Sequence, residues 1–163
     1  MAQRDIFLRI EGSRQGLLRG ESQDASHPGE IDVMSWSWGM DSPGDAFGLP
    51  TGRTNVELLR VTKRVDSAST ALMSALRANE LIRKVVLTVR KAGDEPLAYF
   101  TLTLENARLV QQRIRGGEGE DDAILTEELA LSFQKVRVEY LPQLRTGGGS
   151  GVHTFETVLN GPP

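Results

Sequence analysis

The side-chain types best suited to catalysis lie together in one short segment that ends at His27. A serine, a histidine and an aspartate can form a nucleophilic triad, in which the histidine takes the hydroxyl proton and the aspartate orients the imidazole. Ser22 or Ser26, His27 and Asp24 supply these types. However, the Gly-x-Ser-x-Gly turn is absent, and the three groups lie too close along one loop. We therefore predict that His27 bonds to backbone in a turn before Pro28, and that the chain is not an enzyme.

A second segment, 116–122, has a composition that suggests ion binding. It combines three glycines with four acidic residues. A phosphate-binding loop would end in Lys-Ser or Lys-Thr, and the acids would repel phosphate. A calcium loop would need alternating acids and a distal glutamate. We predict a solvated hairpin tip here. The chain has no cysteine, which excludes thiolate metal sites, and we expect neither a metal nor a cofactor.

Composition also argues against nucleic-acid and membrane binding. The 163 residues carry 22 acids against 19 basic residues, a net charge of −3, so no global field favours polyanions. Arg108, Arg113 and Arg115 form a small basic cluster that the following acids dilute, with no aromatic ladder beside it. The start of the chain has no long apolar run, so we expect neither a signal peptide nor a membrane span. Function should therefore lie in protein surfaces.

The strand that organises the remaining sequence is expected over 30–39. Successive side chains of a strand point to opposite faces. One face then holds Met34, Trp36 and Trp38, and we expect this face in the core because indoles bury large areas. The other face ends in small polar residues, Ser35 and Ser37, which suit contact with water or another protein.

Alternating apolar residues predict further strands, separated by glycine- and proline-containing turns. A last long strand over 124–141 changes parity, which indicates either a bulge near Gln134-Lys135 or a change of partner. One helix is expected over 67–79, capped by Asp66 or Ser67, with an apolar stripe of Leu72, Met73 and Leu76. The fold class is all-β with one α-helix, a closed or nearly closed barrel. The other strands are expected over 5–11, 17–19, 53–65, 85–90, 97–114 and, as a short closing strand, 152–159.

A protruding loop is predicted over 41–52, where proline and glycine are too frequent for a strand interior. It carries Phe47 and Leu49, two apolar residues that a solvated loop does not need. Either they fold back onto the barrel or they contact a partner. The residues that we single out in this loop are Asp41, Ser42, Pro43, Asp45, Phe47 and Leu49.

Four separated blocks of the chain resemble the Hcp family, the haemolysin-coregulated proteins of bacterial type VI secretion. They are Gly20–His27, Glu30–Gly39, Leu87–Gly93 and Leu125–Gln143, in the family's order. The resemblance covers about Asp5 to Gln143, and it makes 1–163 one Hcp-like domain. The turn 12–19 is longer than in the family, and the C-terminal tail, 145–163, matches weakly.

The resemblance implies a two-sheet β-barrel flanked by a short helix, which assembles as a hexameric ring. Such rings stack into the inner tube of the secretion machine, contact its spike and sheath proteins, and hold small effector proteins in the channel. We expect Ser35 and Ser37 to line that channel and the loop 41–52 to stack rings. The chain would reside in the bacterial cytoplasm and then leave through the machine without a signal peptide. The alternative is a monomeric β-barrel that binds a small ligand inside.

Overall fold

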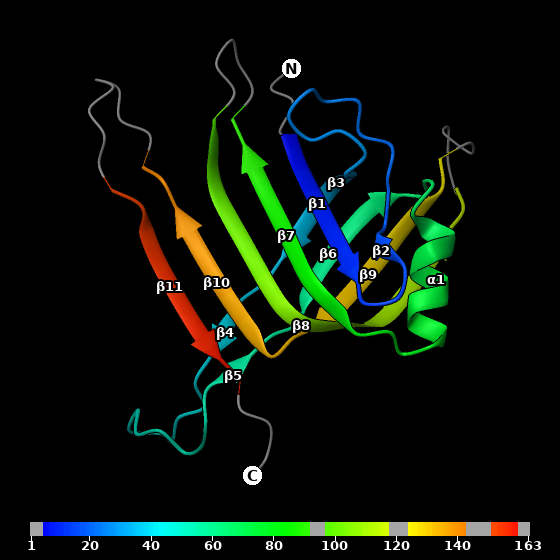
Figure 1. The fold of residues 1–163 in the computed structure, drawn as a ribbon. Helices are drawn as coiled ribbons and strands as arrows, with labels where there is room; N and C mark the ends of the chain where they lie inside the picture. Colours follow the sequence, from blue (N-terminus) through cyan, green and yellow to red (C-terminus); the bar gives the residue numbers. More distant parts are fainter. Residues whose placement is uncertain (1–4, 92–96, 118–123, 143–150, 160–163) are drawn as a thin grey trace.

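The computed structural model describes residues 5–91, 97–117, 124–142 and 151–159 (Figure 1). Strands dominate, as the alternating sequence predicts, and one helix lies beside them. In chain order the elements are β1 (Asp5–Gly12), β2 (Gly16–Leu17), β3 (Ile31–Ser37), β4 (Met40–Asp41), β5 (Asn55–Val56), β6 (Leu59–Arg64), α1 (Ser69–Arg77), β7 (Ile82–Arg90), β8 (Ala98–Arg115), β9 (Thr126–Ser132), β10 (Lys135–Tyr140) and β11 (His153–Val158).

Six of these strands close a barrel in the order β8-β7-β1-β3-β6-β9. Closure occurs because β8 pairs with β7 along its first part and with β9 along its second part. The predicted barrel is confirmed. One detail is wrong: the C-terminal strand does not close it, since β11 pairs only with β10 and extends one sheet past the barrel (Figure 1).

The parity change predicted in the last long strand has a definite origin. The strand breaks at Phe133-Gln134 into β9 and β10. The Gln134 N–H donates to Glu105 O and Asn106 O of β8, and Asn106 has a φ of 51° although β8 continues through it. Both halves keep β8 as a neighbour, but β9 also pairs with β6 whereas β10 pairs with β11. The break keeps Phe133 and Val136 both in the core.

Up to and including Met34, the residues of β3 that face the core are the reverse of those predicted. Ile31 and Val33 are buried, whereas Met34 is 49% exposed. A register shift in the pairing with β6 lies between Val33 and Ser35, so Met34 occupies a bulge and the strand changes phase there. Only beyond the bulge do the indoles point inward, where Trp36 stacks on Phe100 at 5.3 Å.

Helix α1 is shorter than expected and presents a different face. Leu72 and Ala75 are buried, but Met73 is 41% exposed, so its place in the apolar stripe was wrong. Ala68 is the N-cap residue and makes no side-chain cap bond. Asp66, two residues before the N-cap, binds the start of the helix instead, because its Oδ1 accepts the Ala68 N–H at 2.9 Å.

Apolar side chains fill the barrel. All six closing strands contribute to one cluster, with Leu8, Ile31, Leu59, Leu87, Leu102 and Leu131 completely buried. The predicted turn 91–96, the acidic loop 116–122 and the glycine run 145–151 lie wholly or mostly outside the described residues. None of the helices in the described ranges is long and apolar enough to cross a membrane.

Candidate functional site: two exposed surfaces of the barrel

The loop of residues 20–30, which contains His27, is fastened to the barrel, and we call this loop with Arg90 and Asp5 the clamp. Its ends are held by backbone bonds from Gly20 N–H to Gly29 O and from Gly29 N–H to Ser22 O. The His27 ring stacks on Phe7 at 4.3 Å, and its Nδ1 lies 2.8 Å from Glu30 Oε2. The turn before Pro28 is as predicted, but the imidazole contacts a carboxylate rather than backbone.

The three side chains of a serine triad are not assembled in this loop. The Ser22 hydroxyl accepts the Asp24 backbone N–H, and the Asp24 carboxylate binds Arg90. Within the described ranges, moreover, no group of three or more histidine, aspartate or glutamate side chains could hold a metal ion. Ser22, Asp24 and His27 therefore hold the loop in place.

Arg90 is the centre of this clamp. Its guanidinium donates to Asp5 Oδ2 at 2.7 Å and to Asp24 Oδ1 at 2.9 Å, and it lies 5.0 Å from the centre of the Phe7 ring. The hydrogen bond from Arg90, with a second from the Ser26 N–H, lowers the pKa of Asp24 from 3.8 to about 2. The Arg90 guanidinium and the His27 ring both lie against the Phe7 ring, which is why Phe7 is buried although it lies on the outer side of β1.

This clamp should weaken in acid. A carboxylate whose pKa is lower in the folded chain stabilises the fold above its unfolded pKa, and that contribution disappears as the pH falls through the folded pKa. We expect the stability of the wild type to fall more steeply between pH 3.8 and about 2 than that of Asp24→Asn, which should already be less stable at pH 6. Urea unfolding across this range measures both, and equal slopes would contradict the expectation.

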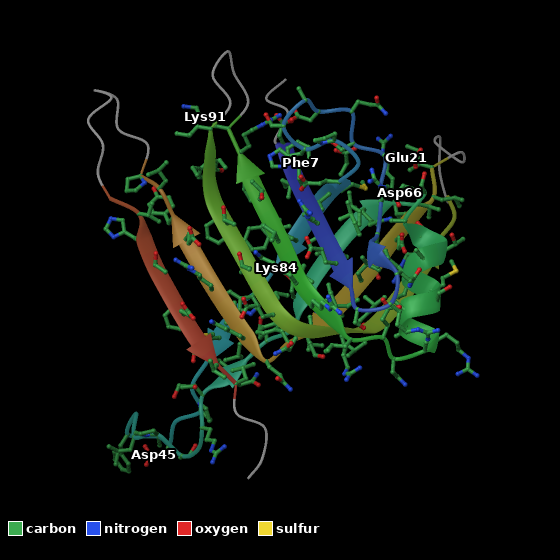
Figure 2. The ribbon with its side chains drawn as sticks, viewed as in Figure 1. Phe7, Glu21, Asp45, Asp66, Lys84 and Lys91 are labelled. Atoms are coloured by element: carbon green, nitrogen blue, oxygen red, sulfur yellow. The ribbon has the colours of Figure 1, made fainter. Side chains whose placement is uncertain are left out.

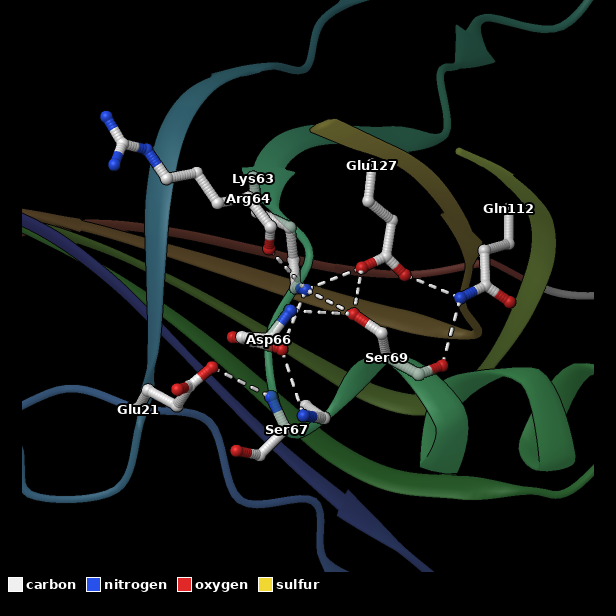
Figure 3. A network of polar contacts seen from close by, with 9 residues as sticks. Glu21, Lys63, Arg64, Asp66, Ser67, Ser69, Gln112 and Glu127 are labelled. Atoms are coloured by element: carbon white, nitrogen blue, oxygen red, sulfur yellow. Dashed lines mark hydrogen bonds and ion pairs between the residues drawn. The ribbon is translucent and has the colours of Figure 1, made fainter. Parts of the chain in front are cut away.

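A buried polar network joins the barrel to the start of α1 (Figure 3). Lys63, on β6, is completely buried, and its ammonium donates to Glu127, to Asp66 Oδ1 at 2.9 Å and to the Ser69 hydroxyl at 3.2 Å. Glu127 also accepts from Ser69 at 2.7 Å and from the Gln112 amide. Buried charges persist only when paired and hydrogen-bonded, as these are. The network fixes the helix to β6, β8 and β9.

The first candidate surface is the outward side of β3 beyond its bulge. Ser35 lies opposite Thr62 and Ser37 opposite Arg60, and both serines are exposed. Trp36, between them, points into the barrel. The strand thus presents hydroxyls outside while the indoles support it from within.

The second candidate surface is the segment predicted as a protruding loop. It is a β-hairpin that projects away from the barrel, started by β4–β5 pairing and continued by a bridge between Gly44 and Pro50 (Figures 1 and 2). Asp45 organises the tip, because its Oδ1 accepts the backbone N–H groups of Phe47 at 2.8 Å and Leu49 at 2.9 Å.

The apolar side chains of this hairpin point into solvent. Phe47 is 89% exposed and Leu49 is 62% exposed, so they do not fold back onto the barrel. Asp41 accepts a hydrogen bond from the Asn55 amide, and Pro43 O accepts one from the Thr51 N–H, while Ser42 is exposed between them. Local bonds therefore hold an aromatic ring away from the protein core.

Comparison with known proteins agrees with this architecture. Residues 7–140 match the family described as "Type VI secretion system effector, Hcp". Protein hcp1 of Pseudomonas aeruginosa PAO1 is 38% identical over 151 residues, which cover 90% of this chain and 89% of hcp1. The chain belongs to the Hcp family.

Solved Hcp structures share the fold along nearly the whole chain. Hcp1 from Salmonella typhimurium is 30% identical with a TM-score of 0.77, covering 97% of this chain and 95% of its own. A type VI secretion system effector from Yersinia pestis is 26% identical with a TM-score of 0.74, covering 95% of this chain and 100% of its own. The β-barrel with one helix is therefore an Hcp fold, and the family is one of secreted structural proteins rather than a known class of enzyme.

Proposed function

We propose that this chain is the repeating subunit of a type VI secretion inner tube, built from stacked homohexameric rings. The two faces of the segment from Ser35 to Trp38 carry the proposal. The indoles of Trp36 and Trp38 complete the barrel core, so the hydroxyls of Ser35 and Ser37 remain on the outer side of the barrel. A ring made by one repeated head-to-tail contact needs only a rotation that closes. The whole of 1–163 would act as one unit of this ring.

In this proposal Ser35 and Ser37 line the ring channel and contact small effector proteins carried there. The loop 41–52, with Asp41, Ser42, Pro43, Asp45, Phe47 and Leu49, contacts the next ring. Spike and sheath proteins are the further partners. The subunit is made in the bacterial cytoplasm and exported by the machine without a signal peptide. A monomeric ligand-binding barrel is disfavoured because apolar side chains fill the interior.

Solution mass and images of the purified chain test the assembly. Light scattering should give about six times the mass of the 17.9 kDa chain, and negative-stain images should show rings with a central hole. A purely monomeric chain without rings would overturn the proposal.

A bulky residue at Ser37 tests the channel wall. We expect Ser37→Gln to leave the ring mass and the urea midpoint unchanged, because the side chain is exposed, but to remove the small proteins that co-purify with wild-type rings from the native host. Ser74→Gln, on the exposed side of α1, is the matched control and should retain them. If Ser37→Gln instead destabilised the fold and kept its cargo, the two faces of β3 would be reversed.

A further inference from the structure

One outer face of the barrel is strongly basic although the chain as a whole is acidic. It lies on the sheet formed by β3, β6, β9 and the second part of β8. We call it the arginine face and define it by the outward charged residues from the row of Arg60 to the row of Arg64, which are Arg60, Arg64, Arg113, Arg115 and Glu128. Arg108, opposite Ser132 in the row beyond Arg60, donates to Asn79 O and is not counted in it.

Strand register places these residues on one surface with the exposed serines. Arg60 lies opposite Ser37 on one side and opposite Ala130 on the other, and its Nη1 lies 3.4 Å from Gln111 Oε1 across the sheet. One row further along, Arg113 lies opposite Glu128. Directly opposed residues in a sheet share a face. The arginines therefore continue the surface that begins at Ser37.

The charge of this face is poorly compensated. Four arginines and one glutamate give it a net charge of +3, so the rest of the chain carries six net negative charges. Arg115 approaches Glu128 only to 3.7 Å, and in the described ranges no carboxylate forms an ion pair with Arg60 or Arg113. The Arg64 carbonyl oxygen accepts a hydrogen bond from the Lys63 ammonium, but the Arg64 side chain points away from the buried network (Figure 3). That side chain borders an acidic groove of about 530 Å³, which Glu21, Asp32 and Asp66 also line. Arg60 and Arg113 are thus the centre of the basic surface.

We propose that the arginine face selects proteins with acidic surfaces as the cargo of the ring. The inference rests on the proposed function, since it assumes that the Ser37 face lines the channel. Six copies would then place about 18 net positive charges around one channel, whose walls concentrate the field. Complementary charge steers encounter and suppresses partners of the wrong sign.

Acidic protein surfaces fit this face better than nucleic acid does. Single strands bind where aromatic side chains stack on the bases as well as where cations track the backbone. Here Trp36 and Trp38 point into the barrel, and the β3 residue opposite Arg60 is Ser37. Hydroxyl and guanidinium groups instead suit the carboxylates and amides of a folded protein.

The test compares one small folded protein of about 100 residues in two surface variants, with net charges of about −10 and +10. Each is titrated into wild-type rings by fluorescence anisotropy at about 0.05 M and about 0.3 M NaCl. We expect the acidic variant to bind at least about tenfold more tightly at low salt, and its affinity to fall at high salt. Arg60→Glu with Arg113→Glu should abolish that preference, whereas Arg83→Glu with Lys91→Glu, equal in charge change but placed elsewhere on exposed positions, should keep it.

Ring mass is measured on every variant, which separates this inference from the proposed function. Failure of the wild type to form rings would overturn the proposed function. Intact rings that bind both probes equally, or that keep their preference in the Arg60/Arg113 variant, would overturn only the cargo inference. A single-stranded oligothymidylate of about 20 nucleotides binding more tightly than the acidic protein would overturn it in favour of nucleic acid.

Discussion

Replacing Glu127 by leucine should lower the free energy of unfolding by about 3–5 kcal/mol, because it leaves the buried ammonium of Lys63 without its main counter-charge. Both side chains of this pair are completely buried, so water cannot take over the lost interaction. The Ser69 hydroxyl and the Gln112 amide lose an acceptor in the same step. Urea unfolding at several protein concentrations measures the change and separates it from any loss of assembly.

Two further variants make this expectation specific. Lys63→Met combined with Glu127→Leu removes both charges, and it should recover most of the stability because an apolar pair of similar volume needs no compensation. Glu139→Leu removes the partner of Arg137 in an exposed pair and should cost less than about 1 kcal/mol. If Glu127→Leu cost no more than Glu139→Leu, the network would not hold the helix to the barrel.

The sequence carried the signal for this network, because both charged residues sit at core positions. Lys63 continues the buried alternation of Leu59 and Val61, and Glu127 precedes Leu129 with the same parity. A charge in a core phase indicates a buried partner, but the alternation does not say which one. The partners lie 64 residues apart, and only the pairing of β6 with β9 brings them together.

The bulge in β3 was missed for a different reason. Ile31 and Val33 alternate in one phase and Trp36 and Trp38 in the other, and a phase change of this kind correctly predicted the irregularity near Gln134. In β3 the bulged residue, Met34, is itself apolar and extends the tryptophan phase backwards, which hides the change. The sequence shows Arg113 and Arg115 in one basic cluster, but Arg60 and Arg64 join them only through the register by which β9 pairs with both β6 and β8.

In the proposed tube, replacing Phe47 by aspartate should abolish the stacking of rings while leaving single rings intact. The Phe47 side chain is 89% exposed on the hairpin. Asp45 fixes the tip through bonds to backbone N–H groups and not to the Phe47 side chain, so the fold loses nothing. A buried aromatic anchor in an interface contributes about 2 kcal/mol or more, which is about 30-fold in affinity. In the proposed hexameric ring this contact is repeated in every subunit, so the loss in each subunit adds up to a complete loss of the tube.

Sedimentation and negative-stain images distinguish tubes from single rings, and urea unfolding confirms that the barrel is unchanged. Met73→Asp likewise replaces an exposed apolar side chain by aspartate, at a 41% exposed position on α1. It should leave tubes intact if stacking is specific to the hairpin. Asp45→Ala should have an intermediate effect, because it keeps the aromatic ring but loosens the turn that presents it. Tubes of normal length from Phe47→Asp would show that the hairpin projects for some other contact.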